Sequence, residues 1–190
     1  MQKSWAYWVS LVLSPHMYGV IVLSIMTLHC RYSLEILIGS ILFLSILPLA
    51  PILIDLKRGE TDIFITERIK RTKYFLYTAA FYGVASIIYY LLKLFPLFIL
   101  FTTYFFETII HMLVNTHWKI SIHTAGIAGP TTFLTLVIDK RLVILYILLI
   151  PVYIARKKMN AHSDAQLIGG TVLSAATTLV IVELLTSYIV

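Results

Sequence analysis

Charged side chains are scarce in this chain, and their scarcity excludes a soluble domain. Lys, Arg, Asp and Glu make up 13% of the 190 residues, whereas a soluble globular domain carries about 25%. Hydrophobic residues make up 59%, and the mean hydropathy is +0.91. The sequence therefore predicts an integral membrane protein, which we expect in the cell membrane. Because the apolar runs lack the alternation of strands, the predicted fold is an all-α bundle of transmembrane helices.

Three further absences narrow the function. The single cysteine, Cys30, excludes an internal disulfide. No small-residue cleavage pattern follows the apolar run after Lys3, so we expect a retained first span rather than a signal peptide. The formal net charge is +6, but the chain has no soluble basic domain to hold a duplex. We therefore expect the cations to meet membrane lipid headgroups or a phosphorylated substrate, not nucleic acid.

The apolar segments predict one domain, residues 1–190, with six to seven spans. A helix needs about 20 apolar residues to cross a bilayer, and fewer where neighbours shield it. The candidates are residues 5–28, 34–54, 74–92, 95–114, 120–138, 142–155 and 167–190. The sixth is short and contains Pro151, so we expect it to be tilted or partly interfacial.

Three polar clusters interrupt these segments, at residues 62–73, 118–126 and 156–166. When the crossings are counted from the first cluster, all three clusters fall on one side of the membrane. Such convergence is what a binding site requires. The positive-inside bias does not decide which side this is, because the cations that it counts are the proposed ligands.

The second cluster combines Lys119, Ser121 and His123 at the start of an apolar segment. Lys119, Ser121 and the first N–H groups of the following helix would form an anion site, because a helix N-terminus favours negative charge. The structural alternative is that Ser121 caps the helix and His123 is an interfacial imidazole. Four small residues follow, which would let a neighbouring helix approach closely. They are Ala125, Gly126, Ala128 and Gly129.

The third cluster begins with Arg156, Lys157 and Lys158. Alone, these residues are typical of a basic collar that snorkels at a helix end. His162 follows them and precedes the pair Gly169-Gly170, so it is placed to act as a base or nucleophile beside a phosphate that the cations hold.

Together the clusters resemble the type 2 phosphatidic acid phosphatase superfamily, whose members are membrane relatives of the vanadium haloperoxidases. That family carries Lys-x6-Arg-Pro, then Pro-Ser-Gly-His, then Ser-Arg-x5-His-x3-Asp. The second motif here reads Ile120-Ser121-Ile122-His123. The third reads Ala155-Arg156, five residues, His162, three residues and Gln166. In the first motif Arg71-Thr72 stands for Arg-Pro, and Phe64 occupies the lysine position, for which Arg68 or Lys70 would substitute.

The resemblance implies a metal-independent phosphohydrolase without a cofactor, acting on a lipid phosphate or a polyprenyl diphosphate. His162 would attack phosphorus and form a phosphohistidine, while His123 would protonate the leaving oxygen and then activate water. The phosphoryl oxygens would be held by Arg71, Ser121 and Arg156, with Arg68 as the substitute and Lys119 added because of its proximity.

One departure from the family pattern concerns the partner of the nucleophile. Gln166 stands where the family has an aspartate that orients the histidine, and an amide cannot neutralise an imidazolium. Asp164 is the nearest carboxylate in the sequence, and Asp62 or Glu67 could reach in from the first cluster.

The sequence leaves two other functions open. It also leaves open whether the chain forms a homo-oligomer. A prenyl- or phospho-alcohol transferase would bring a diphosphate in on Mg²⁺ held by clustered aspartates, a pattern that Asp55 and Asp62 fit poorly. A non-catalytic phospholipid-binding or transport protein would keep the phosphate pocket without turnover, and the altered first and third motifs favour it. We expect no metal site at His111, His117 and His123, because spacings of six do not share a helix face. Glu107 and His111, four residues apart, are expected to pair inside a helix.

Overall fold

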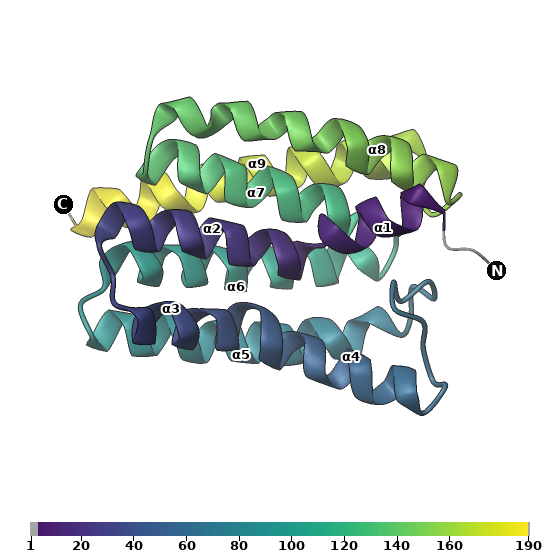
Figure 1. Ribbon diagram of the computed structural model, residues 1–190, viewed down its shortest axis with the longest axis horizontal. Coiled ribbons are helices and arrows are strands. Elements are labelled where there is room, and N and C mark those ends of the chain that lie inside the picture. The colour runs from purple at the N-terminus through teal and green to yellow at the C-terminus, as the bar shows by residue number, and fades with distance from the viewer. Residues whose placement is uncertain (1–3, 190) are drawn as a thin grey trace. The chain divides into compact units, whose positions relative to one another are not determined.

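The computed structural model describes residues 4–189, which are helical and contain no strand, so the predicted all-α class is confirmed (Figure 1). Four helices are long and apolar enough to cross a membrane: Leu34–Lys57, Arg71–Leu91, Phe95–Asn115 and Asp164–Tyr188. A bent pair of helices near the N-terminus makes a fifth crossing if the pair is one span. The six to seven spans are not confirmed, because the fifth predicted segment forms a helix of only 16 residues and the sixth is divided. Lys3 lies outside the described residues.

The chain groups into two compact units, which are described separately. The first unit takes the described residues up to Arg31 and from Ile120 onward, and the second unit is Tyr32–Lys119. The second unit is therefore one continuous stretch that lies, in sequence, between the two parts of the first.

The first unit begins with α1 (Trp5–Val12) and α2 (Pro15–Cys30), which meet at a bend of 45°. The sequence predicted a single span here. The break has a local cause: Pro15 has no N–H with which to continue α1, whereas its fixed φ suits the first turn of a new helix.

The remaining elements of the first unit are α7 (Ile122–Val137), the 3₁₀ helix η2 (Lys140–Leu148), α8 (Leu149–Lys158) and α9 (Asp164–Ile189). α7 packs against α2, η2, α8 and α9, so it is the centre of the unit (Figure 1). The predicted close approach occurs at Gly126, where an added Cβ would lie 2.7 Å from Cβ of Pro15 on α2. The Tyr18 and Thr131 hydroxyls bond at 2.8 Å across the same helix pair.

The second unit contains α3 (Leu34–Ile41), the π-helical turn η1 (Leu42–Ile46), α4 (Leu47–Lys57), α5 (Arg71–Leu91) and α6 (Phe95–Asn115). The first three form one continuous span. Its π-helical stretch comes directly before Pro48 and Pro51, whose missing N–H groups remove regular helical hydrogen bonds. α5 and α6 pack closely, and the rings of Tyr89 and Phe101 stack between them with centroids 5.2 Å apart.

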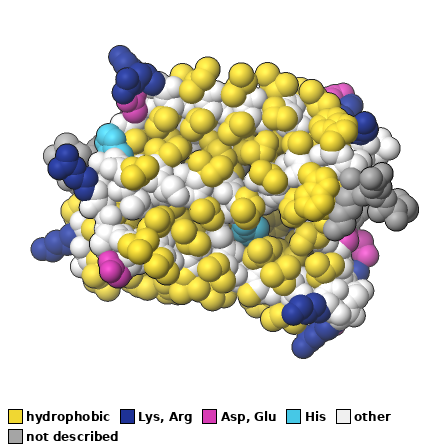
Figure 2. All heavy atoms as spheres, in the orientation of Figure 1, with side chains coloured by type: hydrophobic (Ala, Val, Ile, Leu, Met, Phe, Trp, Pro, Cys, Tyr) yellow, Lys and Arg dark blue, Asp and Glu magenta, His cyan; other side chains and the backbone are white. Residues whose placement is uncertain are grey.

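Large apolar side chains lie on the outside of both units. Leu28, Leu91 and Val172 are 81%, 71% and 60% exposed. Figure 2 shows hydrophobic side chains over the helices, while Lys, Arg, Asp and Glu gather near helix ends. Contiguous exposed apolar surface of this kind is consistent with a membrane protein, because lipid would cover it.

Candidate active site

A tight turn between α8 and α9 sets the spacing of the third motif. α8 ends in a Schellman motif, in which the N–H of Ala161 donates to the carbonyl of Arg156 (3.0 Å) and that of Asn160 donates to Lys157 (2.9 Å). Asn160 has a φ of +48°, in the left-handed region that Asn tolerates better than most residues. The turn leaves Arg156 in the last turn of α8 and His162 at the entry to α9.

A capping box begins α9. The Ser163 hydroxyl accepts the N–H of Gln166 (3.3 Å), and the Gln166 side-chain oxygen accepts the N–H of Ser163 (3.1 Å). The sequence prediction placed Gln166 beside the nucleophile. Its amide oxygen instead serves the helix start next to His162, and Ser163-x-x-Gln166 is a capping sequence that could have indicated this role.

Ser121 caps α7, as its structural alternative predicted. Its hydroxyl accepts the N–H of Thr124 at 3.4 Å, a long bond, and its backbone is extended. The helix therefore begins at Ile122, and His123 lies in its first turn.

The starts of α7 and α9 are bonded to each other. The N–H of Ser121 donates to the carbonyl of Gln166 (3.2 Å), and the Thr124 hydroxyl donates to the carbonyl of Leu167 (2.9 Å). At Gly170 an added Cβ would lie 2.4 Å from the Ser121 carbonyl oxygen and 2.6 Å from Oγ1 of Thr124. We call this region the α7–α9 crossing. It brings the second and third predicted motifs into one unit, and only glycine fits where the helices are closest.

The polar residues of these two motifs are buried. Ser121 is 0%, Arg156 2%, His162 7% and His123 9% exposed, and Arg156 is the largest of the fully buried side chains. Removing a charged group from water costs several kcal/mol unless partners compensate. This is not the snorkelling collar that the basic run alone predicts for Arg156, although the neighbouring Lys157 does follow that pattern.

The His123 ring is fixed by a residue that the sequence did not indicate. Nε2 of His123 lies 3.1 Å from the backbone oxygen of Ser10 in α1. Because a carbonyl can only accept, Nε2 carries the proton in this bond. Ser10 is fully buried, and no sequence signal connects two residues 113 positions apart.

Asp164, the nearest carboxylate to His162 in the sequence, forms an ion pair with Lys157 (2.8 Å). The two side chains are 69% and 48% exposed. Asp164 is also the first residue of α9, where a negative charge complements the helix dipole. Its contacts are therefore those of a surface helix start.

Arg68, Arg71 and Lys119 belong to the second unit. Nη1 of Arg68 donates to the carbonyls of Asn115 (2.7 Å) and Thr116. The side-chain amide of Asn115 donates back to the carbonyl of Arg68 (3.0 Å). Arg68 thus closes the C-terminal end of α6, a structural task the sequence did not predict. Lys119 is partly buried.

Arg71 is buried at the start of α5, and its Nε donates to the carbonyl of Ile65 (2.9 Å). The same loop is shaped by Asp62, whose carboxylate accepts the N–H groups of Phe64 (2.9 Å) and Thr66 (2.7 Å). Some loss of hydration opposes ionisation of Asp62, but the two N–H donors outweigh it and hold the pKa of the carboxyl below its ordinary value. Asp62 is thus committed to the loop backbone, and Glu67 pairs with Lys70 (2.8 Å).

The remaining candidates from the sequence are the Glu107–His111 pair and a histidine metal site. Glu107 and His111 are both buried on α6, and Nδ1 of His111 bonds to the backbone oxygen of Glu107 (2.7 Å). Between residues 4 and 189, no three His, Cys, Asp or Glu side chains gather into a group that could hold a metal ion.

No protein-family model, curated protein or solved structure matches the chain. The resemblance to the phosphatase superfamily therefore rests on the motif residues named above and stays a prediction.

Proposed function

We propose that this chain is an integral membrane phosphohydrolase that removes phosphate from a lipid phosphate or a polyprenyl diphosphate through a phosphohistidine. The observation that carries the proposal is the α7–α9 crossing. It joins Ser121 and His123 to the segment of Arg156 and His162 in one unit, with all four side chains buried. Two histidines can serve as nucleophile and as acid–base, and an arginine and a helix N-terminus can stabilise the charge of a transferring phosphoryl group without a metal.

In the first step a ring nitrogen of His162 attacks phosphorus and the bond from phosphorus to the leaving oxygen breaks. His123 gives its proton to that oxygen, so the lipid leaves as an alcohol, or as a monophosphate from a diphosphate. In the second step His123 takes a proton from water, the resulting hydroxide attacks the phosphohistidine, and inorganic phosphate leaves with His162 regenerated. No metal enters either step.

In the proposed mechanism the bond between His123 and the Ser10 carbonyl distinguishes the two ring nitrogens. With Nε2–H held by that carbonyl, Nδ1 is the nitrogen that gains and loses a proton. A fixed ring keeps the acid oriented for the leaving oxygen and then for water.

Positive charge at the site comes from Arg156 and the N-terminus of α7. A transferring phosphoryl group spreads negative charge over its equatorial oxygens, so donors fixed in a buried site stabilise it strongly. The proposal that Arg68, Arg71 and Lys119 also bind phosphate rests on the motif resemblance.

We also propose six to seven spans, in one domain of the cell membrane. The bent pair α1–α2, the 16-residue α7, and η2 with α8 would add to the four long helices. Helices shorter than about 20 residues cross where neighbours shield their ends, and α7 has neighbours on several sides.

A second candidate, a non-catalytic protein that binds or transports phospholipids, is favoured by one observation. Gln166 carries no charge and its oxygen serves the capping box, while the carboxylate of Asp164 pairs with Lys157. Neither residue is thus disposed like the aspartate that stabilises a protonated nucleophile in the family. Such a protein would hold the phosphate without turning it over.

The test is phosphate release by the purified full chain in detergent. The substrates are phosphatidate, phosphatidylglycerophosphate and a polyprenyl diphosphate, each with and without EDTA. We expect His162→Ala and His123→Ala to lower the rate by about 10³-fold or more. The matched control is His117→Ala, which removes an exposed imidazole at the end of α6. Label from ³²P-lipid should be trapped on the wild-type chain in an acid-labile form and be absent from His162→Ala.

Undiminished activity in both variants, or complete inhibition by EDTA, would overturn the proposal. Tight binding of the phosphorylated lipid without product would favour the non-catalytic protein. Mg²⁺-dependent transfer to an added alcohol would favour the transferase.

A further inference from the structure

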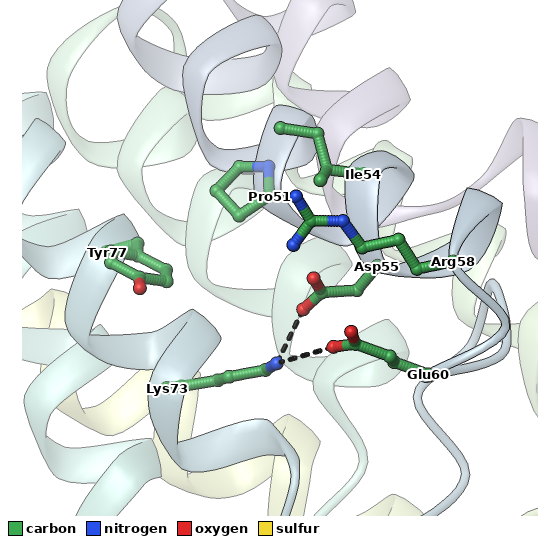
Figure 3. A pocket seen from close by; sticks show the side chains of 7 residues that line it. All are labelled: Pro51, Ile54, Asp55, Arg58, Glu60, Lys73 and Tyr77. Atoms are coloured by element: carbon green, nitrogen blue, oxygen red, sulfur yellow. Dashed lines mark ion pairs between the residues drawn. The ribbon is translucent and has the colours of Figure 1, made fainter.

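A shallow pocket of about 480 Å³ lies between the end of α4 and the start of α5, wholly within the second unit (Figure 3). None of its residues belongs to the proposed phosphohydrolase machinery. Its lining combines four charged side chains with an apolar remainder. The lining residues are Pro51, Ile54, Asp55, Arg58, Glu60, Lys73 and Tyr77.

A glycine turn shapes one wall of the pocket. α4 ends in a Schellman motif, in which the N–H of Glu60 donates to the carbonyl of Asp55 (2.9 Å) and that of Gly59 donates to Leu56 (3.1 Å). Gly59 has a φ of +73°, which glycine adopts without strain. The turn brings Glu60 back beside Asp55 instead of letting the chain run outward.

Ion pairs fix the floor of the pocket. Nζ of Lys73 lies 2.5 Å from Oδ2 of Asp55 and 4.0 Å from Oε2 of Glu60, as the dashed lines in Figure 3 mark. The hydroxyl of Tyr74 donates to the same oxygen of Asp55 (2.7 Å). Asp55 is therefore satisfied by two donors, whereas Glu60 has only a long contact to a shared ammonium.

The guanidinium of Arg58 is available for a ligand. The Arg58 side chain is exposed and makes no hydrogen bond or ion pair within the described chain, although its charge acts on the carboxylate of Asp55. In Figure 3 it lies along the pocket near Pro51 and Asp55. Arg58 and Lys73 balance Asp55 and Glu60, so the pocket has no net charge but offers both signs. It suits a ligand that itself carries one charge of each sign.

The position of the pocket indicates the kind of ligand. It lies where the span Leu34–Lys57 ends and the span Arg71–Leu91 begins, which is the level of lipid headgroups. Ile54 and Tyr77, which lie next to the charged residues on the side of the apolar spans, are each 49% exposed. A ligand with a charged head and apolar chains would meet both surfaces at once.

We propose that this pocket binds the headgroup of a zwitterionic phospholipid with a primary ammonium, the chemistry of phosphatidylethanolamine. The phosphodiester lies against Arg58 and Lys73, and the ammonium against Glu60 and the ring of Tyr77. A headgroup with only negative charge leaves Glu60 facing an anion, and a trimethylated ammonium has no N–H to donate to Glu60.

Native mass spectrometry of the full chain released from detergent tests this proposal. The chain is titrated with phosphatidylethanolamine, phosphatidylcholine and phosphatidylglycerol of identical acyl chains. We expect phosphatidylethanolamine to bind at least about fivefold more tightly than the other two, a factor that one charge-assisted hydrogen bond supplies. Arg58→Gln should weaken it by a similar factor, and Glu60→Gln should remove the preference over phosphatidylglycerol.

Arg141→Gln is the matched control, because Arg141 is an exposed cation at another helix end. Equal binding of the three lipids, or affinities unchanged in both pocket variants, would overturn the proposal. Phosphate release from monoesters should stay at the wild-type rate in Arg58→Gln, so the outcome is separate from that of the proposed enzyme.

Discussion

Each unit contains a helix that ends in the same type of turn, but the charged side chains at the two turns differ in their burial and in their partners. Asn160 follows the end of α8 and Gly59 follows the end of α4, both with positive φ, and in each case the returning N–H bonds to the residue at the third position from the helix end. That residue is Arg156 in the first unit and Asp55 in the second. Arg156 is followed by the buried His162, whereas Asp55 pairs with the exposed Lys73 on the floor of a shallow pocket.

This difference in burial suggests different tasks for the two sets of charges. Asp55 itself is buried, but Lys73 and Glu60 beside it are 44% and 53% exposed. Exposed charges pair with a gain of only about 0–1 kcal/mol, so these two side chains can turn to an incoming headgroup at little cost to the stability of the fold. A buried cation is costly to the free protein, and its interaction with a bound phosphoryl group is strong because water is excluded. Under the two proposals, the turn at Arg156 supplies a buried cation for catalysis, and the turn at Asp55 lies beside exposed charges that select a ligand.

The largest effect is expected at Arg156, whose burial is one side of the comparison. Arg156→Ala should lower kcat/KM for phosphate release by about 10²–10³-fold, the usual loss when one fixed donor to the transition state is removed. Lys157→Ala is the control, because Lys157 is half-exposed and pairs with Asp164, and it should change the rate by no more than about twofold. Thermal unfolding of both variants should be measured to check that each is folded. Equal losses in the two would contradict the distinction between buried and exposed cations.

A smaller effect is expected at the α7–α9 crossing. Gly170→Ala places a Cβ 2.4 Å from the Ser121 carbonyl, so α7 and α9 must separate, at a cost of about 1–3 kcal/mol. The midpoint of thermal unfolding in detergent should fall by roughly 2–4 °C per kcal/mol, and phosphate release should fall with it.

Gly39→Ala is the matched control for that substitution. Its Cβ would lie 3.8 Å from Oη of Tyr89 in α5, which is ordinary contact. Because alanine is the better helix former by about 1 kcal/mol, this variant should be as stable as the wild type or more stable. If both glycine variants behave alike, the crossing is not the tight point that we describe.

The smallest effect is expected at Asp62, in the loop of the second unit. Its pKa lies below the ordinary value of 3.8, so the ionised form stabilises the folded loop above that pH. The stabilisation is lost as the pH falls below about 4 toward the folded-state pKa. Because Asp62 is exposed, the loss should be below about 1 kcal/mol. Asp62→Asn should abolish it, as measured by thermal unfolding at pH 6 and pH 3, and an equal acid loss in the variant would contradict the assignment.

Apolar run length predicted where helices lie but not how they are joined. The described residues of all seven predicted segments are mostly helical. Uninterrupted apolar runs in lipid leave the backbone no other way to satisfy its hydrogen bonds. The break before Pro15 was readable from the proline itself. The grouping of residues 4–31 with 120–189 was not, because it depends on helix contacts between segments far apart in sequence.

For the candidate site, motif spacing predicted the residues, and the structure shows the packing around them. Ser121, His123, Arg156 and His162 were named from the sequence, and all four are buried in one unit. The roles of Ser10 and Thr124 were missed, and Gly170 was named without the close contact to α7 that it allows. A backbone carbonyl as in Ser10, or the closeness of two backbones as at Gly170, leaves no mark on the residue types.

The first unit is made of two segments that residues 32–119 separate in the sequence, so its two parts are synthesised at different times. The Ser10 carbonyl leaves the ribosome well before the imidazole that it holds, and the whole second unit is made between them. At about 5–20 residues per second, residues 32–119 take roughly 4–18 s to synthesise. During that time α1 lacks its contacts with α8 and α2 lacks its contacts with α7, so the first unit can close only after the second has been made.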